Sequence, residues 1–189
     1  PETYGVTVNV NKDGTDWLNH GKTFRLVNAD DDSVTTNLNA VTDGTYGIYE
    51  GTVDTGVDVT VDGASTDATV DYYTVTFYDG VTAYGAGTDQ APQIILKGKK
   101  AAAPPQNPVK ADYVFNGWFT ENGGTTEFSF DNTAVTQATS VYAGWTYDTS
   151  GVAEVSFSVS QNGPYYKNDE VTLLVSVKNS TTNAEITTG

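Results

Sequence analysis

The stretch Tyr73-Thr74-Val75-Thr76-Phe77 decides the fold class, together with Tyr113-Val114-Phe115-Asn116-Gly117-Trp118-Phe119 forty residues later. In both stretches apolar and polar residues alternate, which is the period of two expected of strands with one buried face. Gly117 precedes Trp118, and another glycine precedes Trp145, which indicates bulky rings packed over bare backbone. We therefore expect an all-β module with both indoles in its core.

The turns and short motifs between and after these strands follow a recognisable order. Gly98-Lys99-Lys100-Ala101 forms a turn, a proline-rich stretch spans 104–108, and Val141-Tyr142-Ala143-Gly144-Trp145 closes the segment. This order resembles the Listeria–Bacteroides repeat, also met as the internalin B-repeat, with its pattern Y-x-V-x-F, G-x-x-A-x-x-P, GY-x-F-x-GW and YA-x-W. The sequence departs from that pattern at Ala111-Asp112, where a Gly usually precedes the Tyr. It departs again at 81–88, which replace an Asn-Gly-Gly hairpin.

The resemblance carries expectations for the fold and for the role of the segment. It implies a small β-grasp-like module, placed here at residues 72–147. Such modules are strung along secreted or wall-attached bacterial proteins, where they serve as spacers, as adhesive units or as both. The resemblance thus implies an extracellular location, at the cell surface or in the cell wall.

The preceding residues, 1–71, divide into short strands separated by Gly, Asp and Asn turns. Gly5–Val10 places three valines on one face, and Thr23–Val27 presents Phe24 and Leu26 to one side. This spacing favours a β-sandwich. The segment is also weakly similar to prealbumin-like and collagen-adhesin B-type modules. Because Ala68–Val75 is strand-like and contains neither Pro nor Gly, we expect a stiff junction with the repeat.

The last residues, 148–189, contain two strand patterns, Glu154–Ser160 and Glu170–Lys178. Two strands alone are marginal, and about 40 residues without cysteine rarely support a core of their own. We interpret this segment as the start of a third, truncated β-sandwich. Its open edges predict self-association through 152–189.

Composition narrows the possible partners and cofactors. The 189 residues carry a net charge of −15 and no cysteine, so neither disulfides nor thiolate metal sites are available. The acidic balance argues against nucleic acid, because phosphates would be repelled. No apolar run approaches the roughly 18 residues of a membrane span. Residue 1 is Pro, and neither a signal peptide nor a sorting tail is recognisable, so we expect a longer precursor.

Catalytic and metal chemistry find little support in the residue inventory. A serine triad would need His20, the single histidine, which lies in a turn-like stretch without a nucleophile motif. We therefore expect that the chain is not an enzyme and has no cofactor. Glycosidase chemistry by a pair of carboxylates among the 24 acidic residues is the one alternative that the inventory leaves open. Calcium is the most plausible ion, at Asp13…Asp16 or at Asp30-Asp31-Asp32, but neither stretch matches an EF-hand loop. We expect solvated turns at both places and commit to no metal site.

Four residues remain as candidates for ligand binding. Trp17 is the aromatic residue that the strand pattern explains least, and an exposed indole can stack on a sugar. Lys97, Lys99 and Lys100 form a basic patch in an acidic chain and could meet acidic glycans. Two functional hypotheses follow. The chain is a non-catalytic spacer of a surface protein, or it is a ligand-binding module for a host glycan or matrix protein.

Overall fold

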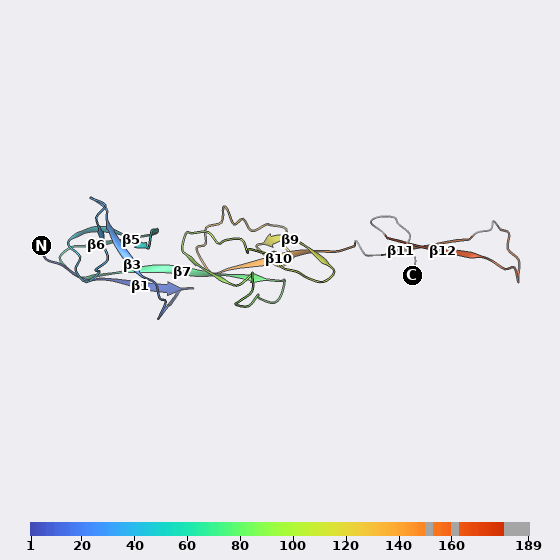
Figure 1. Ribbon diagram of the computed structural model, residues 1–189, viewed down its shortest axis with the longest axis horizontal. Coiled ribbons are helices and arrows are strands. Elements are labelled where there is room, and N and C mark those ends of the chain that lie inside the picture. The colour runs from blue at the N-terminus through green and yellow to red at the C-terminus, as the bar shows by residue number, and fades with distance from the viewer. Residues whose placement is uncertain (150–152, 160–162, 180–189) are drawn as a thin grey trace. The chain divides into compact units, whose positions relative to one another are not determined.

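The structure is a computed structural model that describes residues 1–149, 153–159 and 163–179. These residues form twelve strands and no helix, which confirms the all-β prediction (Figure 1). The strands are β1 Val6–Lys12, β2 Thr15–Asp16, β3 Phe24–Asn28, β4 Val34–Thr35, β5 Gly44–Glu50, β6 Val53–Val61, β7 Thr66–Tyr78, β8 Gln93–Leu96, β9 Tyr113–Phe119, β10 Thr139–Tyr147, β11 Ala153–Val159 and β12 Leu173–Asn179. Among the described residues there is accordingly no helix long and apolar enough to cross a membrane.

The N-terminal segment is a β-sandwich. One layer is the antiparallel sheet β4-β3-β5-β6, and the other is formed by β2, β1 and the first half of β7. Buried residues from both layers, with Val41 from the loop before β5 and Leu96 from β8, make one continuous core: Val6, Val10, Leu26, Val41, Tyr46, Ile48, Val59, Val61, Val70, Tyr72 and Leu96. The valine faces read from the sequence are therefore the faces that pack together.

The pairing of β1 with β7 is parallel and joins residues far apart in the chain. It runs from Val6 opposite Thr66 to Lys12 opposite Tyr72 without a register shift. Parallel neighbours need a long crossover connection, and here the sheet β4-β3-β5-β6 supplies it. The pairing thus ties the start of the chain to the strand that enters the repeat.

Strand β7 belongs to both the sandwich and the repeat. Residues 66–72 pair with β1, 72–75 pair antiparallel with β8, and 75–78 pair parallel with β10. The continuous strand expected at Ala68–Val75 is therefore confirmed. The domain boundary predicted between residues 71 and 72 falls inside β7 and stays a prediction.

The repeat is a mixed sheet in the order β8-β7-β10-β9, with the parallel pair β7 and β10 at its centre. Trp118 is only 7% exposed, and its ring meets Phe77 edge-on at 5.0 Å, so this indole is a core residue as expected. Trp145 is half-buried and lies against Phe115 at 5.7 Å.

One departure from the family pattern has a backbone explanation. Asp112, which stands where the pattern has Gly, adopts φ +62°. Glycine enters this left-handed region without a steric penalty, and Asp is among the few other residues that tolerate it. The substitution therefore keeps the turn that leads into β9.

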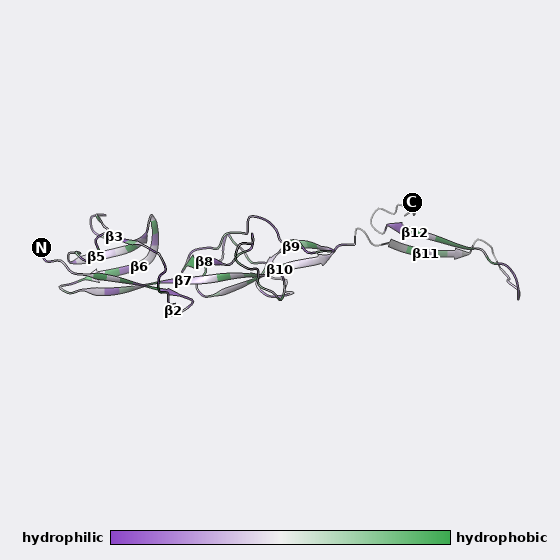
Figure 2. Cartoon of the chain, turned by 60° about the horizontal axis from the view of Figure 1, so that its bottom comes forward, coloured by the Kyte–Doolittle hydropathy of each residue, from purple (hydrophilic) through white to green (hydrophobic). Residues whose placement is uncertain are grey.

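The two strands after the repeat form a separate antiparallel sheet. Its register runs from Ala153 opposite Asn179 to Val159 opposite Leu173, so β12 begins three residues later than the strand expected at Glu170–Lys178. Parts of β12 are coloured as hydrophobic in Figure 2. The predicted third sandwich includes residues 150–152, 160–162 and 180–189, which lie outside the described residues.

Candidate ligand-binding surfaces

Trp17 packs against the sandwich more than it faces solvent. Its backbone N–H donates to the Val10 carbonyl at 2.8 Å, which continues the hairpin of β1 and β2. The half-buried indole meets Tyr72 edge-on at 5.8 Å, and the Lys12 ammonium lies 5.2 Å from its centre. A ligand would therefore meet only part of the ring.

Beneath this indole lies a network that the sequence did not indicate. The Tyr72 hydroxyl donates to Glu50 Oε2 at 2.7 Å, and Lys22 Nζ donates to Glu50 Oε1 at 2.7 Å. The Lys22 ammonium also lies 4.8 Å from the centre of the Tyr72 ring. Its members are 22 to 50 positions apart in sequence, so neither periodicity nor a local motif could have grouped them.

The network shifts the pKa of two of its members. Partial burial by itself raises the pKa of the Glu50 carboxyl, but the hydrogen bonds from Lys22 and Tyr72 outweigh it and lower the pKa overall. Burial, followed by the bond to Glu50, raises the pKa of the Tyr72 hydroxyl far above its usual value. Glu50 is thus held as a carboxylate and Tyr72 as a protonated phenol at neutral pH.

His20 takes part in the packing of this end of the sandwich. Its Nδ1 accepts the backbone N–H of Lys22 at 2.8 Å, and its ring lies 6.2 Å from Trp17 and 6.4 Å from Phe24. Both the ring and the Nδ1 lone pair therefore have structural partners, which fits the turn histidine expected from the sequence.

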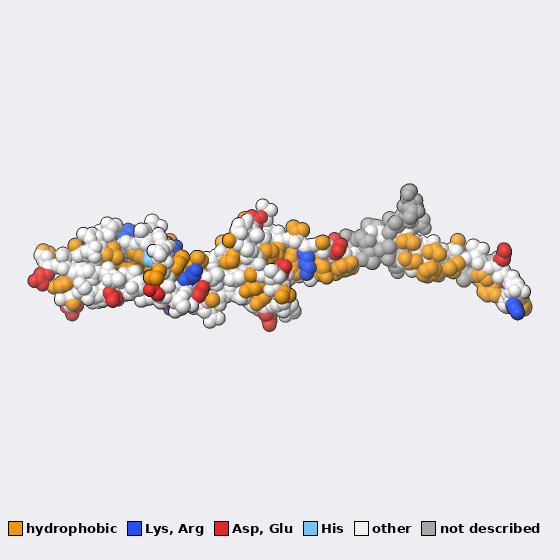
Figure 3. Space-filling view, turned by 90° about the horizontal axis from the view of Figure 1, so that it is seen from below, with side chains coloured by type: hydrophobic (Ala, Val, Ile, Leu, Met, Phe, Trp, Pro, Cys, Tyr) orange, Lys and Arg blue, Asp and Glu red, His pale blue; other side chains and the backbone are white. Residues whose placement is uncertain are grey.

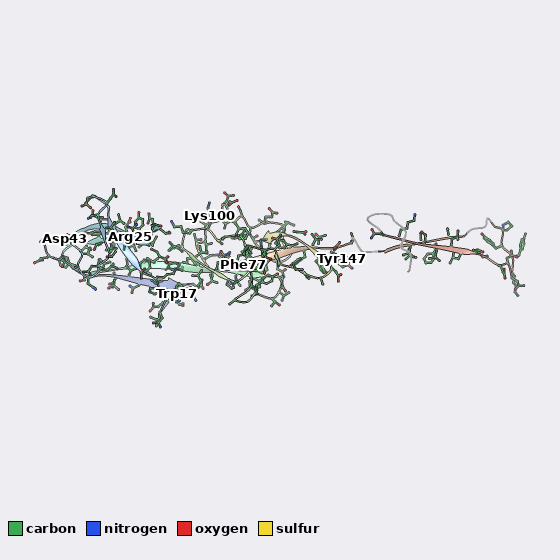
Figure 4. The ribbon with its side chains drawn as sticks, in the orientation of Figure 1. Trp17, Arg25, Asp43, Phe77, Lys100 and Tyr147 are labelled. Atoms are coloured by element: carbon green, nitrogen blue, oxygen red, sulfur yellow. The ribbon has the colours of Figure 1, made fainter. Side chains whose placement is uncertain are left out.

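The three lysines of the basic patch differ in their surroundings: one forms an ion pair, and the other two are exposed on a turn. Lys97 Nζ donates to Asp71 Oδ2 at 3.1 Å, and this bond raises the pKa of the lysine. Lys99 and Lys100 are exposed on the turn that follows β8. Trp17 and Lys100 lie on opposite sides of β7 (Figure 4). The four candidates therefore do not converge on one site.

Lys97 instead lines a groove that the sequence did not reveal. The groove has a volume of about 380 Å³ and lies between β6, β7 and the turn after β8. Its walls are Thr55, Gly56, Val57, Thr69, Asp71, Leu96, Lys97 and Gly98. Strands β6 and β7 and the turn after β8 come together here only through tertiary packing. Of the groove residues, the sequence therefore indicated only Lys97 as a candidate for ligand binding. A second hollow of about 480 Å³ lies beside Arg25, whose Nε donates to the Gly51 carbonyl at 2.5 Å.

The acidic stretches considered for calcium stabilise the local backbone. Asp31 Oδ1 accepts the Ser33 N–H at 2.9 Å, and hydrogen bonds from Ser33 lower the pKa of this carboxyl. The carboxylate of Asp13 accepts both the N–H and the hydroxyl of Thr74, at 2.7 and 2.6 Å. Within the described ranges no group of three or more His, Asp or Glu side chains is arranged to hold a metal ion.

Comparison with known families identifies the central segment. The central segment is a small module with a mixed sheet and a buried indole. Residues 73–144 match the model of the Listeria-Bacteroides repeat domain, which confirms the resemblance read from the sequence. This repeat is typical of bacterial surface proteins. No curated protein matches the chain.

Proposed function

We propose that this chain is a non-catalytic part of a secreted or wall-attached bacterial surface protein, in which it serves as a spacer within a stalk. The observation that carries the proposal is the continuity of β7, whose 13 residues run from the sandwich into the repeat. A spacer has to hold its neighbouring modules in a defined orientation. A shared strand does so better than a flexible linker, because it has no freely rotating residues between the modules.

A side-chain clamp supports the same role. Asp13, at the tip of the hairpin of β1 and β2, has φ +53° and bonds to Thr74 through both carboxylate oxygens. The Asp13 N–H also donates to the Tyr72 carbonyl at 2.9 Å. Three hydrogen bonds therefore join the sandwich to the strand just where it enters the repeat.

The stiffness of this junction can be measured in solution. Residual dipolar couplings of backbone amides in residues 1–71 and 73–144 should fit one alignment tensor, because a rigid pair of modules aligns as a single body. Two tensors of clearly different magnitude would show independent motion and would contradict the spacer role. Antibody labelling of intact cells that produce the parent protein, with and without protease treatment, tests the surface location.

Ligand binding to a host glycan or matrix protein is the second candidate function. It is favoured by the exposed ammonium groups of Lys99 and Lys100 and by the accessible part of Trp17. We expect saturable binding to a glycan, mucin or matrix-protein panel to weaken in Trp17→Ala or Lys99→Glu. An absence of binding across the panel leaves the spacer role as the better proposal.

A further inference from the structure

The groove beside Lys97 combines polar and apolar walls in a small volume. About 380 Å³ lies near the lower end of the roughly 300–1,000 Å³ typical of small-molecule sites, which occur preferentially where domains meet. The half-buried Val57 contributes aliphatic surface, whereas Thr69, Asp71 and Lys97 contribute polar groups. Leu96 also lines the groove but is only 7% exposed. A ligand that fits must therefore present both an apolar face and several hydrogen-bonding groups.

The ion pair offers an acceptor and a donor side by side. Lys97 Nζ and Asp71 Oδ2 are 3.1 Å apart, and the lysine side chain is 52% exposed. An ammonium has three donors and a carboxylate about four acceptor positions. The bond between them and the bond from Asn11 Nδ2 to Asp71 Oδ1, at 3.3 Å, use only part of this capacity. The remaining donors and acceptors can bind two neighbouring hydroxyl groups, one that accepts from Lys97 and one that donates to Asp71.

The backbone leaves the groove accessible from solvent. Gly56 and Gly98 line it with φ +71° and +81°, and a methyl group at either position would meet no atom within 4 Å. Because the two glycines carry no side chains, the space beside them is open to solvent, and a sugar ring can approach the ion pair from outside. Thr69 is exposed on β7 and adds a hydroxyl group on the same side.

We propose that this groove binds a neutral hexopyranose ring, with two adjacent hydroxyl groups on Asp71 and Lys97 and the C–H face of the sugar on Val57. A neutral ligand is favoured because the chain carries a net charge of −15 and the lysine charge is already paired with Asp71. The proposal rests on the second candidate function, ligand binding, but places the ligand away from Trp17, Lys99 and Lys100. Its failure leaves the spacer role intact.

The test is a titration followed by amide chemical shifts. The probes are the methyl glycosides of glucose, galactose and mannose, with sialic acid as an anionic comparison. We expect at least one neutral glycoside to shift the amides of Gly56, Thr69 and Gly98 in a saturable manner. Asp71→Asn and Lys97→Gln should each weaken this binding about tenfold or more, because each removes a charge-assisted hydrogen bond.

Matched variants separate the groove from the general surface. Asp67→Asn changes an exposed carboxylate on the same strand, and Lys110→Gln changes an exposed lysine that does not line the groove; both should bind as the wild type does. Unshifted groove amides with all three glycosides overturn the proposal, as does binding that survives both Asp71→Asn and Lys97→Gln. Sialic acid that shifts amides near Lys100, while the neutral glycosides leave the groove amides unshifted, also overturns it and supports the second candidate function.

Discussion

At the residue scale, the Glu50 carboxylate links three parts of the sandwich. It accepts hydrogen bonds from Lys22, just before β3, and from Tyr72 on β7, while Glu50 itself ends β5. Hydrogen bonds to charged groups contribute more than neutral ones, about 1.5–3 kcal/mol in buried settings and less where solvent reaches them. Glu50 is half-buried, so its contribution belongs to the lower part of that range.

The pH dependence of stability tests this network. The folded-state pKa of Glu50 lies below its ordinary value of 4.5. The associated stability is therefore present above pH 4.5 and is lost as the pH falls through the folded pKa. We expect Glu50→Gln to be less stable than the wild type at pH 7 and the difference to shrink steadily below pH 4.5. Chemical denaturation across this range measures it, and a difference that does not vary with pH would contradict the assignment.

Adding a Cβ atom at Gly144 tests how tightly the repeat is packed. A Cβ at this position would overlap the ring of Phe119, which packs over the bare backbone. Forcing extra volume into packed structure typically costs about 1–3 kcal/mol, so Gly144→Ala should lower the free energy of unfolding by that amount. Gly85→Ala is the control, because a Cβ there meets no atom within 4 Å. Equal stabilities of the two variants would show that the Phe119 ring moves aside without cost.

At the element scale, the sheet of β11 and β12 has one strongly apolar face. Val155 is paired with Val177, and Phe157 with Val175, while Ser156 and Ser176 share the opposite face. Phe157 is 65% exposed, and hydrophobic side chains gather over this segment in Figure 3. Two strands with an uncovered apolar face are marginal in water and have open edges. Self-association of this sheet, expected from the sequence, therefore remains our proposal.

Phe157→Ser tests that proposal. Full burial of a phenylalanine side chain is worth about 1.5–3 kcal/mol, so the variant should weaken self-association about tenfold or more. Sedimentation equilibrium over a range of protein concentrations measures the association constant. Ser158→Ala, on the opposite face of the same strand, should leave it unchanged. A wild-type chain that stays monomeric at high concentration would rule self-association out.

At the scale of the whole molecule, the junction between the sandwich and the repeat depends on the clamp between Asp13 and Thr74. Asp13→Gly keeps the positive φ of the turn but removes both side-chain hydrogen bonds. We expect hydrogen exchange of the Thr74 amide to accelerate about tenfold or more, because its acceptor is lost. Thr74→Val, which removes only the bond to the hydroxyl, should cause a smaller change. Unaltered exchange in Asp13→Gly would mean that β7 needs no clamp.

Much of the fold was predictable because its signals are local. The alternating residues in Tyr73–Phe77 and Tyr113–Phe119 indicate one buried face, and the glycine before Trp145 indicates a ring packed on bare backbone, which is the ring of Phe119. The spacing of these motifs was enough to recognise the repeat matched at 73–144. The ends of strands were predicted less accurately, as for β12, because the last residue pairs of a strand depend on the partner strand.

The order of neighbouring residues was sufficient to predict an all-β chain whose middle matches the Listeria–Bacteroides repeat. Other contacts could be seen only after folding: Lys97 pairs with Asp71, Tyr72 and Lys22 meet at Glu50, and Trp17 packs against Tyr72. These contacts join residues up to 55 positions apart in the chain. Such distances are closed by the parallel pairing of β1 with β7 and by the packing of two sheets, neither of which a local pattern records.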